Sequence, residues 1–116
     1  MNTISVWLIH HKASLDQHSP MNLDGSTYMV GIGVVPAPDI RAALDAFDVY
    51  LQKQDMAALE ITKCERYHPA NFPPTTTDNR EIAEAATDAL EEGVVSYVCG
   101  ISSEALECME DNGNDE

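Results

Sequence analysis

Residues 30–51, VGIGVVPAPDIRAALDAFDVYL, change from the pattern of a strand to the pattern of a helix within one stretch. Pro38 suits the first helical position, where a missing N–H costs nothing, and Asp39 faces the positive end of the helix dipole. The stretch therefore predicts a strand over about 26–35 followed directly by a helix. The apolar face of this helix comprises Ile40, Ala43, Leu44, Phe47, Tyr50 and Leu51.

The glycines of this stretch raise the question of a nucleotide site. Gly31 and Gly33 match the beginning of the dinucleotide-binding pattern GxGxxG, but Pro36 occupies the place of the third glycine. The Gly-Lys-Ser/Thr of a phosphate-binding loop does not occur either. We therefore interpret the two glycines as small residues that let a helix or a neighbouring chain approach the strand closely. No cofactor is predicted.

Outward from this stretch the chain alternates between strand and helix patterns. Asp78, with Glu81 three residues later, fits a capping box and predicts a second helix that begins at Asp78 and ends at Gly93. A short final helix is expected over about 102–109. Period-two alternation predicts further strands over 3–9, 57–67 and 94–101.

These elements predict an α+β fold, a two-layer sandwich in which two main helices cover one face of a mixed sheet of about four strands. A short C-terminal helix is the last element of this predicted fold. Residues 1–111 are expected to form a single α+β domain, and residues 112–116 a disordered acidic tail. The sheet face without helices would be half apolar, which predicts a homodimer.

Charge is the most unusual property of the chain. Twenty acidic residues against six Lys and Arg give a net charge of −14, and residues 78–116 carry twelve of the acids with Arg80 as the only base. Such a surface repels nucleic-acid phosphates and anionic membranes, so neither is an expected partner.

Cysteine usage and hydropathy indicate the compartment. Cys64, Cys99 and Cys108 form an odd number without CxxC spacing, which favours a reducing environment over a disulfide framework. No apolar run approaches the ~18 residues of a membrane span, and the start of the chain lacks a basic leader. We predict a cytoplasmic protein.

The second predicted helix carries a stripe of acids at spacings of three and four, with no Lys or Arg between them on that face. Like charges at these spacings repel, so the stripe lowers helix stability. It is either a solvated face that keeps the protein soluble or a docking surface for a basic partner. The candidate partner-binding residues are Glu81, Glu84, Asp88, Glu91 and Glu92.

A rival site lies at the end of the last predicted strand, where Cys99 and Ser102 precede a helix amino terminus that would stabilise a thiolate or an oxyanion. Tyr67 and His68, from the proline-rich loop, are candidate residues of a pocket there. The alternative interpretation is purely structural: Ser102 caps the final helix, and Cys99 is a small buried residue.

Histidine and cysteine spacings fit no recognised metal site, so none is predicted. We favour a small binding or regulatory protein, of the inhibitor, immunity or mimic type, that presents the acidic helix to a basic protein. The alternative is a small enzyme or ligand-binding protein that uses Cys99 and Ser102. Catalysis is the less favoured interpretation because no convincing catalytic constellation occurs.

Overall fold

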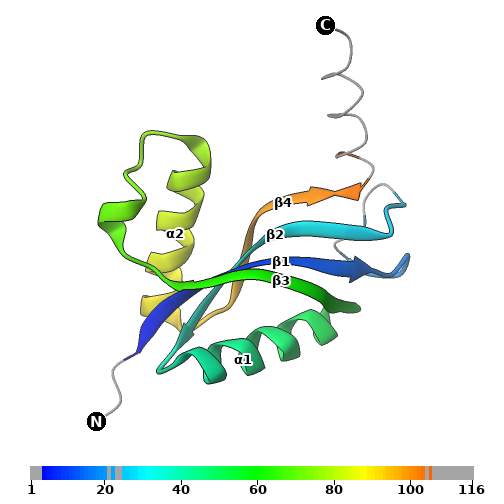
Figure 1. The fold of residues 1–116 in the computed structure, drawn as a ribbon, viewed down its shortest axis with the longest axis horizontal. Helices are drawn as coiled ribbons and strands as arrows, with labels where there is room; N and C mark the ends of the chain where they lie inside the picture. The colour runs from blue at the N-terminus through cyan, green and yellow to red at the C-terminus, as the bar shows by residue number, and fades with distance from the viewer. Residues whose placement is uncertain (1–3, 21, 23–24, 104, 106–116) are drawn as a thin grey trace, which may run out of the picture.

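The computed structural model describes residues 4–20, 22, 25–103 and 105. Their strands form a four-stranded sheet in the order β3-β1-β2-β4, with each pairing antiparallel (Figure 1). The elements are β1 (Ser5–Leu15), β2 (Tyr28–Ala37), α1 (Ile40–Lys53), β3 (Met56–Arg66), the 3₁₀ turn η1 (Pro69–Asn71), α2 (Thr77–Glu92) and β4 (Ser96–Ser102).

The predicted α+β class, with about four strands and two main helices, is confirmed. The sheet is antiparallel instead of mixed, and the path of the chain explains the difference. β2 and β3 run in the same direction, but the connection through α1 places β3 beside β1 instead of beside β2. Parallel strands are therefore never neighbours in this sheet.

The two helices cover opposite faces of the sheet, which corrects the expected two-layer arrangement. α1 packs Phe47 against Trp7 and Ile9 of β1, whereas α2 packs Ile82 against Leu8. Adjacent residues of a strand point to opposite faces, so alternate residues of β1 serve different helices. Figure 1 draws α1 below the strands and α2 above one end of them. The result is three layers, with the sheet in the middle.

β1 continues to Leu15 instead of ending near residue 9. As a central strand it pairs with β2 on one side and with β3 on the other, so residues 10–14, which are polar except for Ala13, still satisfy their backbone groups. His10 and His11 point to opposite faces, as alternation requires. His10 contacts Glu65, and His11 lies against Phe47 under α1.

α1 begins at Ile40, two residues later than Pro38 suggested, because Asp39 is its N-cap. The Asp39 carboxylate accepts a hydrogen bond of 2.8 Å from the backbone N–H of Ala42. The helix crosses β2 closely at Gly33, where a Cβ would overlap the Phe47 ring. The interpretation of Gly33 as a residue of close approach is therefore confirmed.

α2 begins at Thr77, so the predicted start at Asp78 is one residue late. Thr76 is the N-cap, and its hydroxyl accepts a hydrogen bond of 3.1 Å from the N–H of Asn79. Asp78 lies in the first turn, where its charge is favourable. Gly93 ends the helix with φ of 69°, as predicted.

β3 departs from simple alternation because its register against β1 shifts twice, next to Leu59 and next to Thr62. Each shift adds one residue to β3 relative to β1, as in a β-bulge. Ala58, Ile61 and Cys64 consequently share the α1 face, although the sequence pattern placed Ile61 and Cys64 on opposite sides.

The predicted final helix over 102–109 and the acidic tail over 112–116 lie largely outside the described residues, and Ser103 and Ala105 carry the described helical assignments. Within the described part of the chain, neither helix has both the length and the apolar composition needed to span a membrane.

Candidate functional site: the acidic face of α2

The acidic stripe of α2 borders an open groove beside the edge strand β4. The buried side of α2, formed by Ile82 and by Ala85, Ala86 and Ala89, fixes the helix on the sheet and turns the acids outward. The groove has a volume of about 220 Å³, and its residues come from both elements: Glu81, Glu84, Ala85, Asp88, Ser96 and Val98.

The acids of α2 have no cationic partner among the described residues. Both ion pairs in that part of the chain belong to Glu65 of β3, whose carboxylate lies 2.9 Å from His10 Nε2 and 3.5 Å from Lys63 Nζ. All five candidate partner-binding residues of α2 are exposed. The last turn, with Glu91 and Glu92, contains no base that would offset the negative end of the helix dipole.

Glu81 differs from the other acids of the stripe because it contacts β4. Its carboxylate Oε2 lies 3.4 Å from the backbone N of Cys99 and 3.8 Å from the Cys99 Sγ, and both groups donate to it. Cys99 has φ of 55°, and the register against β2 shifts between Val30 and Ile32. This bulge turns the N–H and the thiol of Cys99 toward α2.

The surroundings of Cys99 keep its thiol protonated. Burial, together with the nearby carboxylates of Asp78 and Glu81, raises the pKa of Cys99 to about 11. A reactive cysteine needs the opposite, a pKa lowered by positive charge or by a helix N-terminus. The arrangement makes Cys99 a hydrogen-bond donor that joins β4 to α2, and it does not activate a nucleophile.

The same three residues are the ones that could hold a metal ion. The ligand atoms of Asp78, Glu81 and Cys99 lie within 4.8 Å of one another, with both carboxylates exposed and the thiol half-buried. Two acids and a thiolate are chemically suitable ligands for zinc. However, hydrogen bonds from Cys99 to Glu81 already account for the proximity, and the positive end of α2 disfavours a cation.

The other candidate pocket residues make contacts of their own. The Ser102 hydroxyl accepts a hydrogen bond of 3.3 Å from the N–H of Ala105, as a capping serine does. Tyr67 stacks on Phe72 at 5.6 Å, and both rings pack beside the α2 core. The exposed His68 precedes η1, and its side chain makes no capping hydrogen bond there.

Two features of the surface were not anticipated from the sequence. One is the contact of Glu81 with Cys99, because eighteen residues separate them and only the fold brings them together. The other is a groove between α1 and β3 that includes Asp45 and Asp48. Their spacing of three on the polar side of α1 was the visible signal.

Comparisons with protein-family models, with curated proteins and with solved structures found no match. The functional interpretation of this chain therefore depends on its own geometry and charge.

Proposed function

We propose that the protein is a small cytoplasmic binding or regulatory protein whose acidic α2 face docks onto a basic protein partner. The observation that carries this proposal is the absence of intramolecular cations opposite the acids of α2 in the described residues. Carboxylates arranged for stability would pair with Lys or Arg three or four residues away. The one such base on α2, Arg80, forms no ion pair with Glu84 in the described structure. Unpaired and exposed, these acids remain available for a partner and attract it over long range.

The groove beside β4 gives the acidic face a shape as well as a charge. Glu84 and Asp88 border it on the helix side, and Val98 contributes an apolar surface from the strand. A Lys or Arg side chain has an apolar stem and a cationic end. Such a side chain fits a groove with this combination of walls, which supports a protein ligand over a simple counterion.

Two further expectations belong to this proposal. The cytoplasmic location rests on the cysteine pattern, and Cys64 and Cys99 are free thiols. Homodimer formation stays a prediction, although its original basis is weaker because helices cover parts of both sheet faces. The enzyme alternative at Cys99 and Ser102 is not pursued, since the raised pKa of Cys99 opposes thiolate chemistry.

Affinity capture with matched variants tests the proposed function. The protein is used as bait at low salt, next to a variant with Glu84→Gln, Asp88→Asn and Glu91→Gln. A control variant removes three exposed acids that belong to neither groove through Asp16→Asn, Asp55→Asn and Glu60→Gln. We expect a basic protein to be enriched by the wild type and the control, and to be lost with the α2 variant.

Binding of the identified partner is then measured by calorimetry and stopped flow. Neutralising the α2 acids should slow association by roughly tenfold or more, with a weaker dependence on salt, because these charges act before contact. A partner that binds the α2 variant and the wild type equally, or capture that yields no salt-sensitive partner, overturns the proposal.

A further inference from the structure

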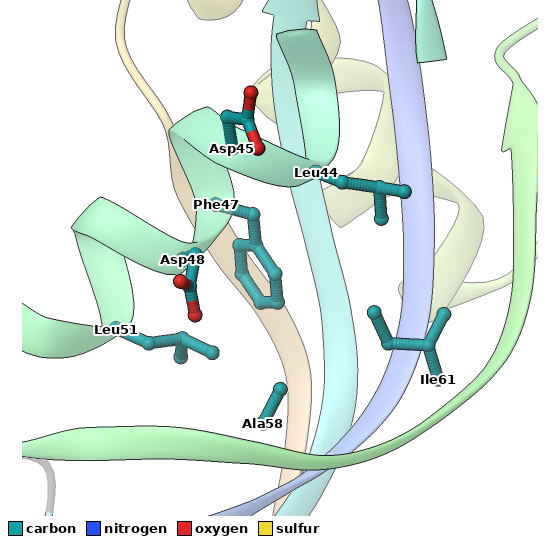
Figure 2. Close-up of a pocket in the computed structure, with 7 residues that line it drawn as sticks. All are labelled: Leu44, Asp45, Phe47, Asp48, Leu51, Ala58 and Ile61. Carbon is teal, nitrogen blue, oxygen red and sulfur yellow. The ribbon is translucent and has the colours of Figure 1, made fainter. Parts of the chain in front are cut away.

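A second groove lies on the opposite side of the molecule, between α1 and the edge strand β3. It has a volume of about 240 Å³. Figure 2 shows Leu44, Phe47 and Leu51 on the helix side of this groove, with Ala58 and Ile61 on the strand side. The carboxylates of Asp45 and Asp48 stand on the helix at its border. The groove is therefore apolar inside and acidic at the rim.

The strand side of this groove carries apolar residues that are exposed to solvent. β3 pairs only with β1 in the described sheet, so its outer edge faces solvent. Leu59 is 58% exposed and Ile61 is 43% exposed. Exposed apolar side chains next to a groove are typical of protein-binding surfaces. The two bulges of β3 twist the edge, which disfavours a long added strand and leaves recognition to side chains.

The charge at the rim selects the kind of ligand. Asp45 and Asp48 take part in no ion pair among the described residues. A cation would therefore find two unpaired carboxylates one helical turn apart. Acidic ligands are repelled by these groups and by the net charge of −14. This argument excludes nucleic acid, and it also disfavours the chain's own residues 104–116, which carry six acids and no base.

We propose that the groove between α1 and β3 docks a short segment of another protein that carries an apolar anchor flanked by Lys or Arg. The anchor side chain packs on the accessible groove residues Leu44, Ala58 and Ile61. The basic side chain pairs with Asp45 or Asp48. This site is separate from the acidic face of α2, because the two helices lie on opposite faces of the sheet.

Peptide selection tests this second site directly. A random library of 12-residue peptides on phage is selected on the immobilised full-length protein. We expect the selected sequences to share an apolar residue next to Lys or Arg. Selection of acidic or purely polar sequences, or of none at all, overturns the proposal.

The best selected peptide is then synthesised, and its binding is measured by fluorescence anisotropy. Ile61→Ser should weaken binding by about tenfold or more, the loss expected for an anchor contact. The control Leu90→Ser removes an apolar residue on α2 that is 59% exposed, against 43% for Ile61, and should leave binding unchanged. Asp45→Asn with Asp48→Asn should weaken binding and reduce its salt dependence.

Three outcomes would contradict this assignment. Equal binding by the wild type and the Ile61→Ser variant would place the peptide elsewhere. Loss of binding in the α2 variant with Glu84→Gln, Asp88→Asn and Glu91→Gln would assign the peptide to the acidic face of α2. A dimer in sedimentation that dissociates on Ile61→Ser would make a second copy of this chain the occupant. Circular dichroism of each variant verifies that it folds.

Discussion

The buried residue His11 combines two properties that make the fold sensitive to pH. Its side chain is 3% exposed and lies in edge contact with Phe47 and Tyr97, at ring-centroid distances of 4.6 and 4.9 Å. Nδ1 is 2.8 Å from the carbonyl oxygen of Ile9, which can only accept, so Nδ1 carries the proton. Nε2 is buried without a partner in the described structure. A second proton on this ring would have no acceptor.

Stability should therefore fall as the pH is lowered through the titration of His11. Burial lowers the pKa of His11 below the ordinary histidine value of 6.5, so the unfolded chain takes up the proton first. The stability that neutral His11 contributes is fully present above pH 6.5 and is lost progressively below that pH. Urea unfolding at pH 7.5 and 5.5 measures the loss. The loss of stability between these two pH values should be smaller in a His11→Leu variant than in the wild type. In His18→Gln, a control at an exposed site, the loss should equal that of the wild type. An equal loss in all three proteins contradicts the prediction.

Cys99 should react slowly with alkylating agents, because its raised pKa leaves little thiolate at neutral pH. Glu81→Gln removes one of the charges that raise the pKa. The rate of carbamidomethylation at pH 7.5, followed on the Cys99 peptide by mass spectrometry, should then increase. About tenfold more thiolate forms for each unit by which the pKa falls. Glu84→Gln, one turn further along α2, serves as the control, and similar rates in both variants would disprove the effect.

At the scale of single elements, the position of α1 on the sheet depends on the absence of a side chain at Gly33. A Cβ there would overlap the Phe47 ring, which is itself fully buried. Gly33→Ala should therefore destabilise the protein by about 1–3 kcal/mol, the usual cost of overpacking. In the background of Phe47→Leu the same change should cost less, because the smaller side chain leaves space. Chemical denaturation of the four proteins in this cycle measures the coupling, and additive costs would refute it.

The acidic stripe of α2 should cost the element stability. Asp88→Lys replaces repulsion from Glu84 and Glu92, both four residues away, with attraction, and it places a base near the negative end of the helix dipole. We expect the free energy of unfolding to increase by about 0.5–1 kcal/mol, which is the sum expected for two side-chain pairs at a spacing of four on a helix. Asp88→Asn should give roughly half of this gain.

Thermal and urea unfolding of both variants measure this trade-off. A loss of stability in the Lys variant would mean that the acids support the fold, and it would remove the reason to assign them to a partner. The predicted gain would instead indicate that the sequence keeps these acids at a thermodynamic cost.

At the scale of the whole molecule, the negative charge is concentrated instead of spread evenly. α2 carries six acids against Arg80, whereas α1 and β3 each balance two acids with two bases. β3 and β4 are the opposite edges of the sheet, and α2 packs near β4. The charges of α1 and β3 thus balance overall, with Asp45 and Asp48 as a local acidic rim, whereas α2 is acidic as a whole.

Because the acidic residues repel one another, the stability of the protein should rise with salt concentration. Raising KCl from about 10 to about 200 mM shortens the Debye length to roughly 7 Å and screens the repulsion between acids that are further apart than that. The melting temperature should therefore rise by a few degrees. The variant with Glu84→Gln, Asp88→Asn and Glu91→Gln should gain less. A melting temperature that falls with KCl would show that attractive ion pairs dominate instead.

The sequence by itself determined the class of fold and most of the elements. Helical spacing in residues 40–51, Gly93 after the second helix and the existence of the strands all follow local rules, and the structure confirms them. The acidic stripe was also visible, because spacings of three and four place its members on one helix face. Whether any cation lay opposite those acids was not visible, since it depends on segments distant in the chain.

Tertiary structure alone decided the faces, the strand order and the register. β1 has buried apolar residues on both of its sides, so its pattern is equally compatible with helices on one face or on two. The bulges in β3 and at Cys99 likewise have no local signature, yet they place Ile61 in one groove and join Cys99 to Glu81. Pairing partners are chosen by the packing of the whole chain, because local periodicity specifies which residues avoid water and not which neighbours cover them.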